Sequence, residues 1–457
     1  MPTSKPTGGS KREPGATIVT MAVRGPLSFA QQRMLRFVES PLDPIGFHLL
    51  QYVELEGDLD TGALETALGR VAARHPALRT AFRRDGDGEL GQEIEDVVEL
   101  DHVRVDLRHF PDGDWPLRLD AMSVAVAARP FDLTRPPLFR SALVRLPRER
   151  AALVLVFHHL LCDGYALAVF FRDLTAAYKA VLEGVEPAFA EPPGDPVAYA
   201  RWQRERLASE RPRLLDHWRS ELDGADLSTW LSDRPRDVSQ TRGRIYRAHL
   251  PPDTARAVSG LAAAAIPATP FAVLLTAFGF ELARRARRRE VVLTSNVSNR
   301  VRREHESLLA LLANNLPFRL RFDEGATLRD AVRTTGRAVL RTLDRQELPF
   351  SVLIEEVLAP AGPLPRFPSV QIAFPAEAGD WGLALPGVRS NVVDVPPPGA
   401  RGDLLFHVDA DEGGFFCAAV YDENVVSAEE IAELVSDFGA TIGRAAADPD
   451  APADPVG

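Results

Sequence analysis

The chain has 457 residues, of which 45% are hydrophobic and 26% charged, and this is enough for two domains of ordinary size with a large core. Its formal net charge of −11 argues against a nucleic-acid-binding protein, because such proteins need a basic surface to neutralise phosphates. Two cysteines, Cys162 and Cys417, are too few for a disulfide framework or a cysteine-rich zinc site. We therefore expect a cytoplasmic protein, and the excess of Arg over Lys, with abundant Ala and Pro, suggests a GC-rich bacterial genome.

The two ends of the chain have compositions typical of disorder. Residues 1–22 are rich in Pro, Gly, Ser and Lys, lack the apolar core of a secretory signal, and are expected to be a disordered leader. Residues 447–457 are expected to be a disordered tail for the same reason. The longest apolar stretch, which begins at Phe271, is shorter than the roughly 20 residues that cross a bilayer, so no membrane span is expected.

Helical and strand patterns alternate between these ends. In the first half we expect, in chain order, a helix at 27–40 capped by Ser28, a strand at 49–57, a helix at 61–75, strands at 78–84, 139–147 and 151–159, and a helix at 165–182. In the second half we expect a helix at 197–207, a strand at 243–250, helices through 255–288, a strand at 290–298, an apolar segment at 314–322, a helix from 327, strands at 369–374, 403–410 and 415–422, and a helix from 427.

A proline-rich stretch at 185–194 lies between the two halves and is the best candidate linker. The alternation predicts an α/β (α+β) protein with an N-terminal lobe at 23–184 and a C-terminal lobe at 195–446. The densest basic run, at 284–290, is a candidate docking patch, but it also fits a solvated helix end, which favours cations.

The segment 153–171 carries the strongest chemical signal. An unbroken apolar run, typical of a strand buried on both faces, ends at His158 and His159. Asp163 and Gly164 follow directly before a helical run. Neighbouring strand residues point to opposite faces, so the two imidazoles cannot easily bind one metal ion. One of them can instead face a reaction space and, with a pKa of roughly 6.5, accept a proton near neutral pH.

Plainer interpretations of these residues stay open. Asp163 alone is as well explained as a helix N-cap, or it fixes the local backbone through an arginine partner. Gly164 leaves the space beside the base open, where a Cβ would intrude. Cys162 fits a small buried residue better than a nucleophile, because only the histidines could lower its pKa. The sequence contains no G-x-S-x-G elbow, P-loop or dinucleotide fingerprint.

The run His158-His159-x-x-x-Asp163-Gly164 resembles the HHxxxDG signature of the condensation domains of nonribosomal peptide synthetases. Further segments resemble the other motifs of this family, in family order: LSFAQQRMLRF at 27–37, RHPALRTAF at 74–82, DPVAYARWQ at 195–203 with HWRSEL at 217–222, LLANNLPFRL at 311–320 and RQELPFSVLIEEV at 345–357. The asparagine motif departs from the family pattern, because Ala310 and Leu312 replace the usual Gly and Phe.

The resemblance implies two chloramphenicol-acetyltransferase-like lobes in a V shape, with a tunnel between them. It makes His159 the general base or positioning group, and His158 and Asp163 structural. Asp163 would pair with an arginine of the RHPALRTAF motif at 74–82, with Arg74 as first choice and Arg79 as reserve. It implies no metal, and the substrate tunnel would include Ser28, Gln31, Tyr165, Asn314 and Asn315.

The resemblance also implies a function. A free-standing condensation enzyme would take an aminoacyl or acyl group from the 4'-phosphopantetheine of a peptidyl or acyl carrier protein acting in trans. It would pass that group to a small amine or alcohol in antibiotic biosynthesis, for example in enediyne or polyketide tailoring, and would hold no cofactor of its own. Two alternatives remain, namely an acyl-CoA-dependent acyltransferase of the same superfamily and a non-catalytic module that recruits a partner enzyme.

Overall fold

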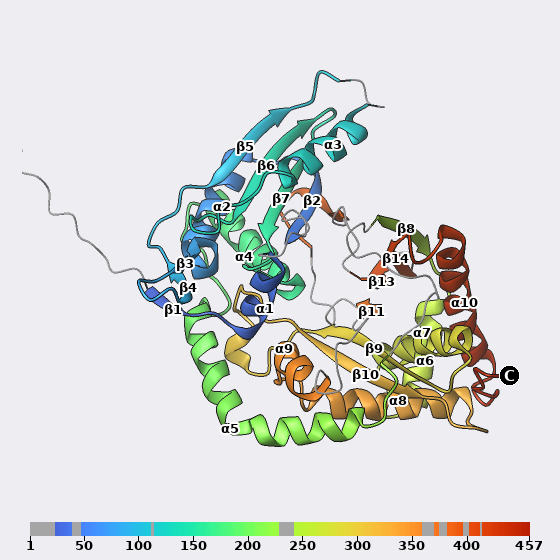
Figure 1. Cartoon of the computed structure of the whole chain (residues 1–457). Helices are drawn as coiled ribbons and strands as arrows, with labels where there is room; N and C mark the ends of the chain where they lie inside the picture. The colour runs from blue at the N-terminus through green and yellow to red at the C-terminus, as the bar shows by residue number, and fades with distance from the viewer. Residues whose placement is uncertain are drawn as a thin grey trace, which may run out of the picture.

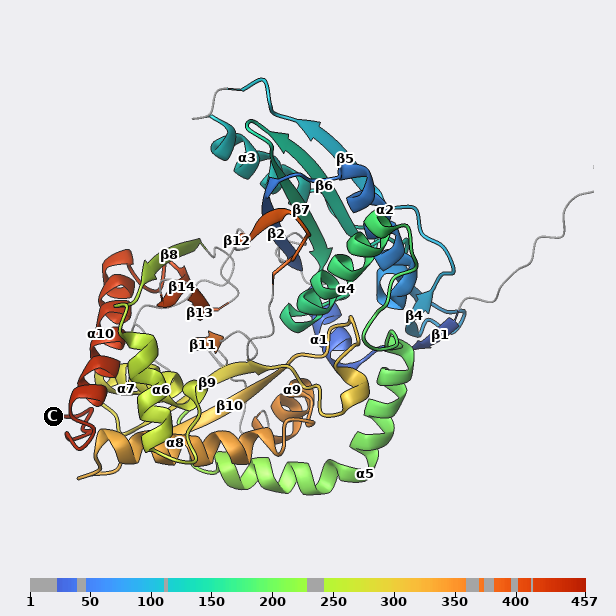
Figure 2. The same ribbon diagram turned by 180° about the vertical axis from the view of Figure 1, so that it is seen from behind.

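The structure is a computed structural model that describes residues 23–38, 47–110, 114–227, 242–358, 370–373, 382–395, 402–411 and 414–457. The expected leader at 1–22 lies outside these residues. Two lobes, each a sheet covered by helices, diverge from a common base and form a V (Figure 1). The long helix α5 (Pro196–Leu222) runs along that base from one lobe to the other (Figures 1 and 2).

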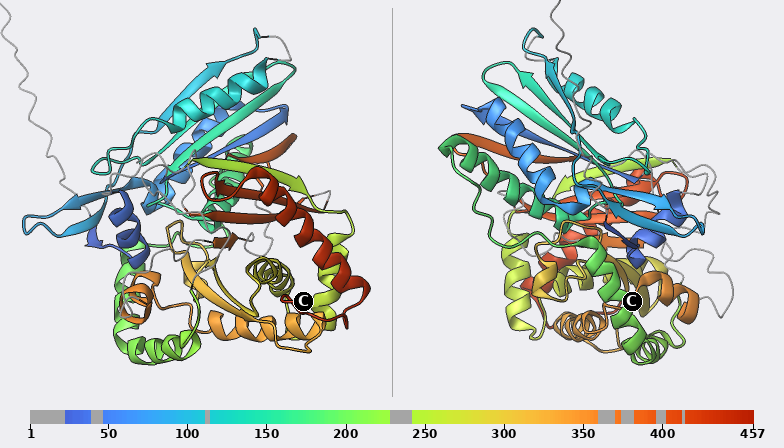
Figure 3. Two further views of the ribbon diagram at one scale, coloured as in Figure 1. Left: turned by 45° about the vertical axis from the view of Figure 1, so that its right-hand side comes forward. Right: turned by 90° about the vertical axis from the view of Figure 1, so that its left-hand side faces the viewer.

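The N-terminal lobe is built on a five-stranded sheet with the order β12-β2-β7-β6-β5. Its strands are β2 (His48–Gly57), β5 (Asp101–Asp106), β6 (Phe139–Leu146), β7 (Arg150–His158) and β12 (Val388–Val395). Its helices are α1 (Phe29–Val38), α2 (Thr61–Arg74), α3 (Trp115–Ala127) and α4 (Gly164–Glu183). Helices α2 and α4 pack together on one face of the sheet and α3 lies on the other (Figure 3).

The central strand β7 explains the unbroken apolar run in the sequence. Leu153, Leu155 and Phe157 join the core beneath α2 and α4. The intervening residues, such as Val154 and Val156, join the second core beneath α3. Both faces of β7 are therefore buried, as its sequence predicts, and the strand is a rigid support for the residues that follow it.

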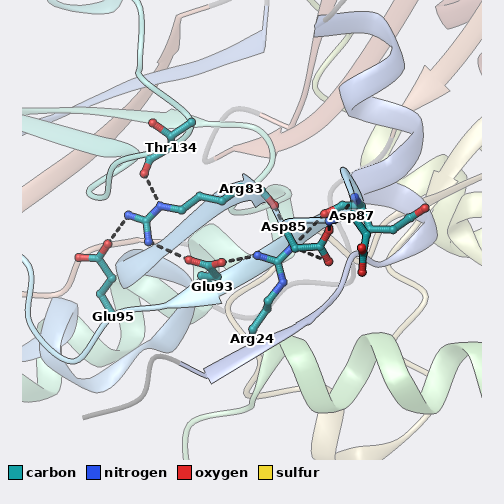
Figure 4. A network of polar contacts seen from close by, with 8 residues as sticks. Arg24, Arg83, Asp85, Asp87, Glu93, Glu95 and Thr134 are labelled. Carbon is teal, nitrogen blue, oxygen red and sulfur yellow. Dashed lines mark hydrogen bonds and ion pairs between the residues drawn. The ribbon is translucent and has the colours of Figure 1, made fainter. Parts of the chain in front are cut away.

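A small sheet with the order β1-β4-β3 lies beside this lobe, and it consists of β1 (Val23–Pro26), β3 (Thr80–Arg84) and β4 (Leu90–Ile94). Figure 4 shows that its charged side chains form one network across the strands. Glu93 lies between Arg24 and Arg83, and its Oε2 is 2.9 Å from Arg83 Nη1. Arg83 Nε also donates to the carbonyl of Thr134 at 2.8 Å, so the network ties the small sheet to the rest of the lobe.

The C-terminal lobe has a six-stranded sheet with the order β10-β9-β11-β13-β14-β8. Its strands are β8 (Gly243–His249), β9 (Glu290–Val297), β10 (Asn314–Arg321), β11 (Val370–Ala373), β13 (Leu404–Asp411) and β14 (Gly414–Asp422). Its helices are α6 (Thr254–Ala264), α7 (Pro270–Ala286), α8 (Leu328–Leu343), α9 (Phe350–Leu353) and α10 (Ala428–Ala447). Phe278 and Phe406 stack in the core that α7 and α10 share with the sheet, and Phe438 packs edge-on against both rings.

The lobe boundary differs from the sequence prediction at β12. This strand comes from the C-terminal half of the chain, yet it pairs antiparallel with β2 of the first lobe, with Val388 opposite Gly57. Without β12, the backbone groups along that side of β2 would be left unpaired. The N-terminal lobe is therefore completed by a segment more than 300 positions further along the chain, since Arg389 stands opposite Glu56 (a separation of 333).

The prediction that residues 447–457 form a disordered tail is also wrong. The carbonyl of Ala451 accepts a hydrogen bond from the backbone of Leu328 at 2.9 Å, and Ala453 donates to Ala326 at 2.8 Å. Ala453 is 1% exposed, so the tail packs against the start of α8. Its many Asp, Ala and Pro residues resemble a disordered composition, but local composition does not report a docking site made by a distant helix.

The basic run at 284–290 is largely neutralised within the lobe. Arg284 and Arg285 both contact Asp437 of α10, at 2.5 and 3.0 Å. Arg288 pairs with Asp226, and Arg289 pairs with Asp454 of the tail at 3.0 Å. These ion pairs favour the structural interpretation of the run over a docking patch.

Among the residues described, no helix is both long and apolar enough to cross a membrane.

The β2–β12 junction generates a stability prediction. Gly57 has φ of +131°, and a Cβ there would collide with the carbonyl oxygen of Gly387. We expect Gly57→Ala to lower the free energy of unfolding by about 1–3 kcal/mol, because it strains the backbone where the two strands meet. Chemical denaturation measures the change.

A matched control is Gly69→Ala in α2, where a Cβ would have no neighbour within 4 Å. This variant should gain about 0.5–1 kcal/mol from helix propensity. Equal effects of the two substitutions would contradict the proposed collision.

Candidate active site

The two histidines lie at the end of β7 and have different surroundings. His158 is 2% exposed, and its ring packs edge-on against His48 of β2 at 5.7 Å between centroids. Its Nδ1 accepts a hydrogen bond from the backbone N–H of Leu160 at 3.2 Å. These contacts account for His158 as a packing residue that shapes the turn after β7.

His159 is only partly buried, and its ring is fixed in one orientation. Its backbone N–H donates to the carbonyl of Phe47 at 2.8 Å. Its Nδ1 lies 2.8 Å from the carbonyl oxygen of Cys162. Because a carbonyl oxygen can only accept, Nδ1 must carry the proton of the neutral ring, and Nε2 carries the lone pair. The arrangement therefore makes Nε2 the basic atom.

Asp163 caps α4 and also binds the other lobe. Its Oδ1 accepts from the backbone N–H of Ala166 at 2.9 Å, so the N-cap interpretation holds. The guanidinium of Arg300 binds the same carboxylate through both terminal nitrogens, with Nη2 to Oδ1 at 3.1 Å and Nη1 to Oδ2 at 3.2 Å. The side chains of Asp163 and Arg300 are 3% and 2% exposed, so this ion pair is buried where the lobes meet.

The prediction that Arg74 or Arg79 pairs with Asp163 is therefore wrong. Arg74 instead binds Asp173 of α4, with its Nε 2.8 Å from Oδ2, and its guanidinium covers the ring of Phe189 at 3.9 Å. Arg79 donates to the backbone carbonyl of Glu95. Arg74 thus packs against α4, and Arg79 packs beside the small sheet. Both contacts lie within the first lobe, whereas Asp163 binds the second lobe.

The true partner, Arg300, follows β9 in the stretch SNRVRRE. Its neighbours Arg302 and Arg303 are exposed, and nothing in the local pattern distinguishes the buried arginine from them. The guanidinium of Arg300 also lies 4.2 Å over the ring of Tyr165, one of the predicted tunnel residues. Its Nη2 donates further to the carbonyl of Ala310 at 3.3 Å, so Arg300 binds both lobes at once.

The segment between β9 and β10 completes the clamp on Asp163. The backbone N–H groups of Leu312 and Ala313 donate to Asp163 Oδ2 at 2.9 and 2.8 Å. Burial alone would raise the pKa of Asp163, but the charge and hydrogen bonds of Arg300, with these backbone donors, lower it below its usual value. The carboxylate is therefore ionised at neutral pH.

The condensation-domain model matches residues 23–456 of the chain. The chain belongs to the condensation-domain family. This confirms the family and the fold class that the HHxxxDG run and its companion motifs predicted.

Several relatives are peptide synthetases that are much longer than this chain. The chain is 36% identical over 359 residues to phosphinothricin tripeptide synthetase PhsC of Streptomyces viridochromogenes, a match that covers 78% of this chain and 33% of PhsC. It is 30% identical to PhsB of the same organism, with 92% of this chain and 36% of PhsB covered. The chain thus spans about a third of the length of these relatives, and they support a condensation domain of the nonribosomal peptide synthetase type.

Solved structures of similar fold include whole chains of comparable length. SgcC5 of Streptomyces globisporus has a TM-score of 0.78 at 26% identity, with 93% of this chain and all (100%) of SgcC5 covered. The X-domain from teicoplanin biosynthesis has a TM-score of 0.78 at 27% identity, with 96% and 99% covered. The first condensation domain of the calcium-dependent antibiotic synthetase has a TM-score of 0.80 at 22% identity, which supports the fold.

The condensation-domain geometry excludes a straightforward nucleophilic role for Cys162. Its side chain is 0% exposed and belongs to the core of the first lobe. Burial, with Asp163 nearby, raises the pKa of the thiol well above its usual value, so the thiolate is disfavoured. The group of Cys162 that contacts His159 is the backbone carbonyl and not the sulfur.

Three of the predicted tunnel residues, Ser28, Gln31 and Asn314, make structural contacts. Ser28 and Gln31 cap α1 reciprocally, because Ser28 N–H donates to Gln31 Oε1 at 2.8 Å and Gln31 N–H donates to Ser28 Oγ at 3.2 Å. Asn314 holds the RQELPF segment through bonds to Leu348 O at 2.7 Å and from Phe350 N–H at 3.0 Å. Their place in a substrate tunnel stays a prediction.

Asn315 and Gly164 lie where the two lobes approach each other. Asn315 Oδ1 is 3.5 Å from the guanidinium of Arg33 on α1, whose pKa burial lowers to about 10. Gly164 is the exposed first residue of α4, next to the carboxylate of Asp163. Both were predicted as site residues from the sequence, but the sequence did not identify Arg33 as a residue of α1 that contacts the second lobe.

The buried ion pair predicts an unusual pH response for Arg300→Gln. At pH 7 this variant leaves the carboxylate of Asp163 buried without its charged partner, and we expect it to lose about 3–5 kcal/mol of unfolding free energy. Wild type is stabilised by the lowered pKa of Asp163 above the unfolded-state value of about 3.9, and this stabilisation disappears as the pH falls through the lower folded-state pKa.

In the variant, Asp163 becomes easier to protonate, so acidification from pH 7 to pH 4 relieves the cost of its buried charge, whereas wild type loses the stabilisation from Asp163 only below about pH 3.9. The difference between the two proteins should therefore shrink between pH 7 and pH 4, as measured by urea denaturation. Arg211→Gln, which removes an exposed ion pair with Glu356, is the control and should change little at either pH. A difference that does not depend on pH would contradict the assignment.

Proposed function

We propose that the chain is a condensation enzyme that acts on a carrier protein supplied in trans. It transfers an aminoacyl or acyl group from the thioester on the carrier's 4'-phosphopantetheine to a small amine or alcohol. The observation that carries this proposal is the orientation of His159, whose Nδ1–H donates to the carbonyl of Cys162, so that Nε2 is the basic nitrogen of the ring. The enzyme needs no cofactor of its own for this reaction.

The reaction balances without a covalent enzyme intermediate. The nitrogen or oxygen of the acceptor attacks the thioester carbonyl carbon, a C–N or C–O bond forms and the C–S bond breaks. The proton of the acceptor passes to His159 Nε2 and then to the sulfur of the leaving phosphopantetheine thiol. A base in this position typically contributes about 10²–10⁴-fold, and holding the acceptor against the carbonyl contributes as well.

Asp163 acts on this reaction only through the backbone. Its carboxylate fixes the start of α4 and binds Arg300, and this holds the short loop between His159 and Asp163 in place. The Cys162 carbonyl belongs to that loop, so the clamp keeps the hydrogen bond to His159 Nδ1 aligned. Asp163 and His158 are thus structural residues in the proposal, as the family resemblance implies.

Two similarities bear on the acceptor. SgcC5, which this chain matches over the whole SgcC5 length, was solved with (R)-(−)-1-(2-naphthyl)-1,2-ethanediol, and a diol is an alcohol that could be esterified. The phosphinothricin tripeptide synthetases are named for a peptide product, which contains amide bonds. We therefore keep both acceptor classes within the proposal and leave the choice to experiment.

One observation favours a second candidate function. The X-domain from teicoplanin biosynthesis was solved in a complex with OxyB, and this chain matches that chain at 26% identity with a TM-score of 0.75. A protein with this fold can therefore bind another protein. As a recruitment module, this chain would bind such a partner whether or not His159 is present.

Intact-protein mass spectrometry on acyl-loaded carrier proteins tests the proposal. Each carrier is mixed with the enzyme and a panel of amines and alcohols, with acyl-CoA as the competing donor. Loss of the acyl mass from a carrier, dependent on both enzyme and acceptor, is the expected outcome, and the product mass identifies the bond. Turnover of acyl-CoA beside untouched carriers would falsify the carrier-dependent reading and favour the soluble acyltransferase.

His159→Ala should lower the rate of this unloading by about 10²–10⁴-fold, because it removes the base and its contact with the acceptor. Cys162→Ala is the matched control, since the alanine keeps the backbone carbonyl that orients His159 while removing the thiol. It should retain most of the activity. Loss of activity in Cys162→Ala together with retained activity in His159→Ala would instead assign the chemistry to the cysteine.

A further inference from the structure

Asn299 occupies an unusual backbone position directly before Arg300. Its φ is +54°, in the left-handed region, and it is 4% exposed. Asn adopts this conformation at lower cost than most other residues with a side chain, and a left-handed residue turns the chain sharply. Arg300 therefore leaves this turn toward Asp163 and not along the direction of β9.

The side chain of Asn299 binds the opposite end of the same segment. Its Nδ2 donates to the carbonyl of Leu312 at 3.3 Å. The backbone N–H of that same residue donates to Asp163 Oδ2 at 2.9 Å. Asn299 thus acts on both parts of the clamp, since its backbone directs Arg300 and its amide restrains Leu312.

A buried hydroxyl holds the amide of Asn299 from the other side. Nδ2 also lies 3.4 Å from the hydroxyl of Tyr199 on α5, which in turn accepts from Gln203 Nε2 at 3.4 Å. Burial raises the pKa of the Tyr199 phenol far above its usual range, so the group stays neutral. Gln203 Oε1 accepts from the backbone N–H of Phe29 at 3.0 Å, which connects this chain of contacts to α1.

We infer that Asn299 is a positioning residue for His159, acting through Arg300 and Leu312 on Asp163 and through the following loop on the Cys162 carbonyl. This inference rests on the proposed function for its kinetic consequence and on the described contacts for its structural one. Each step is a hydrogen bond or a direct chain neighbour, so loosening the first step should loosen the last.

Asn299→Gly tests the role of the amide, because glycine adopts positive φ without strain and removes only the side chain. We expect the rate constant for carrier unloading at saturating acceptor to fall between about tenfold and about 100-fold, with little change in KM, since misplacement of a catalytic group has effects of this size. Asn299→Ala should be worse, because it also strains the backbone.

A second readout does not depend on turnover. Nitrogen-15 NMR of labelled imidazoles, with His159 assigned by His159→Gln, reports which ring nitrogen carries the proton. Wild type should show the Nδ1–H form, and Asn299→Gly should shift toward a mixture as the Cys162 carbonyl moves. Tyr199→Phe should shift the His159 signals in the same direction. The double variant with Asn299→Gly should show little further shift, because both substitutions act on one network.

Val258→Ala in α6 controls for lost stability, because Val258 is 1% exposed and belongs to the core of the second lobe. Reduced melting temperature with unchanged His159 signals and rate is expected for this control. The same result for Asn299→Gly would overturn the inference. If wild type unloads no carrier, the proposed function fails, and the imidazole signals alone still support or overturn the positioning role.

Discussion

The carboxylate of Asp163 is the interaction on which the rest of the structure depends. It caps α4, binds Arg300 from the other lobe and accepts backbone N–H groups from the segment between β9 and β10. Burying a carboxylate is costly, and only a nearly complete set of donors offsets that cost. One group therefore fixes both the start of a helix and the relative position of two lobes, and the loop that orients His159 lies between them.

Much of this could be predicted because it is local in sequence. The apolar run of β7 predicts a strand buried on both faces, and the following Asp163 predicts a helix start. The resemblance to the condensation-domain motifs by itself predicts that His158, His159 and Asp163 lie in one site. The helices expected from 327 and 427 begin directly after Thr327 and Ser427, and in the structure each start is closed by a capping box.

What could not be predicted depends on contacts between distant segments. Arg300 and Asp163 are separated by 137 positions, and several nearby arginines have the same local pattern. The motif containing Arg74 offered a plausible cation, but the side chain of Arg74 binds Asp173, which lies ten residues beyond Asp163 on α4. The docking of Ala453 and the pairing of β12 with β2 likewise use partners that only the folded chain brings together.

The path of β12 has a consequence for recombining such proteins. A chimera joined within residues 185–194 would take the first lobe from one parent and the strand that completes its sheet from the other. The segment that supplies Arg300 would also come from the second parent. Exchange of the first lobe should thus carry β12 and the segment from Asn299 to Ala313 with it, so the transferable unit is a set of contacts and not a continuous stretch of sequence.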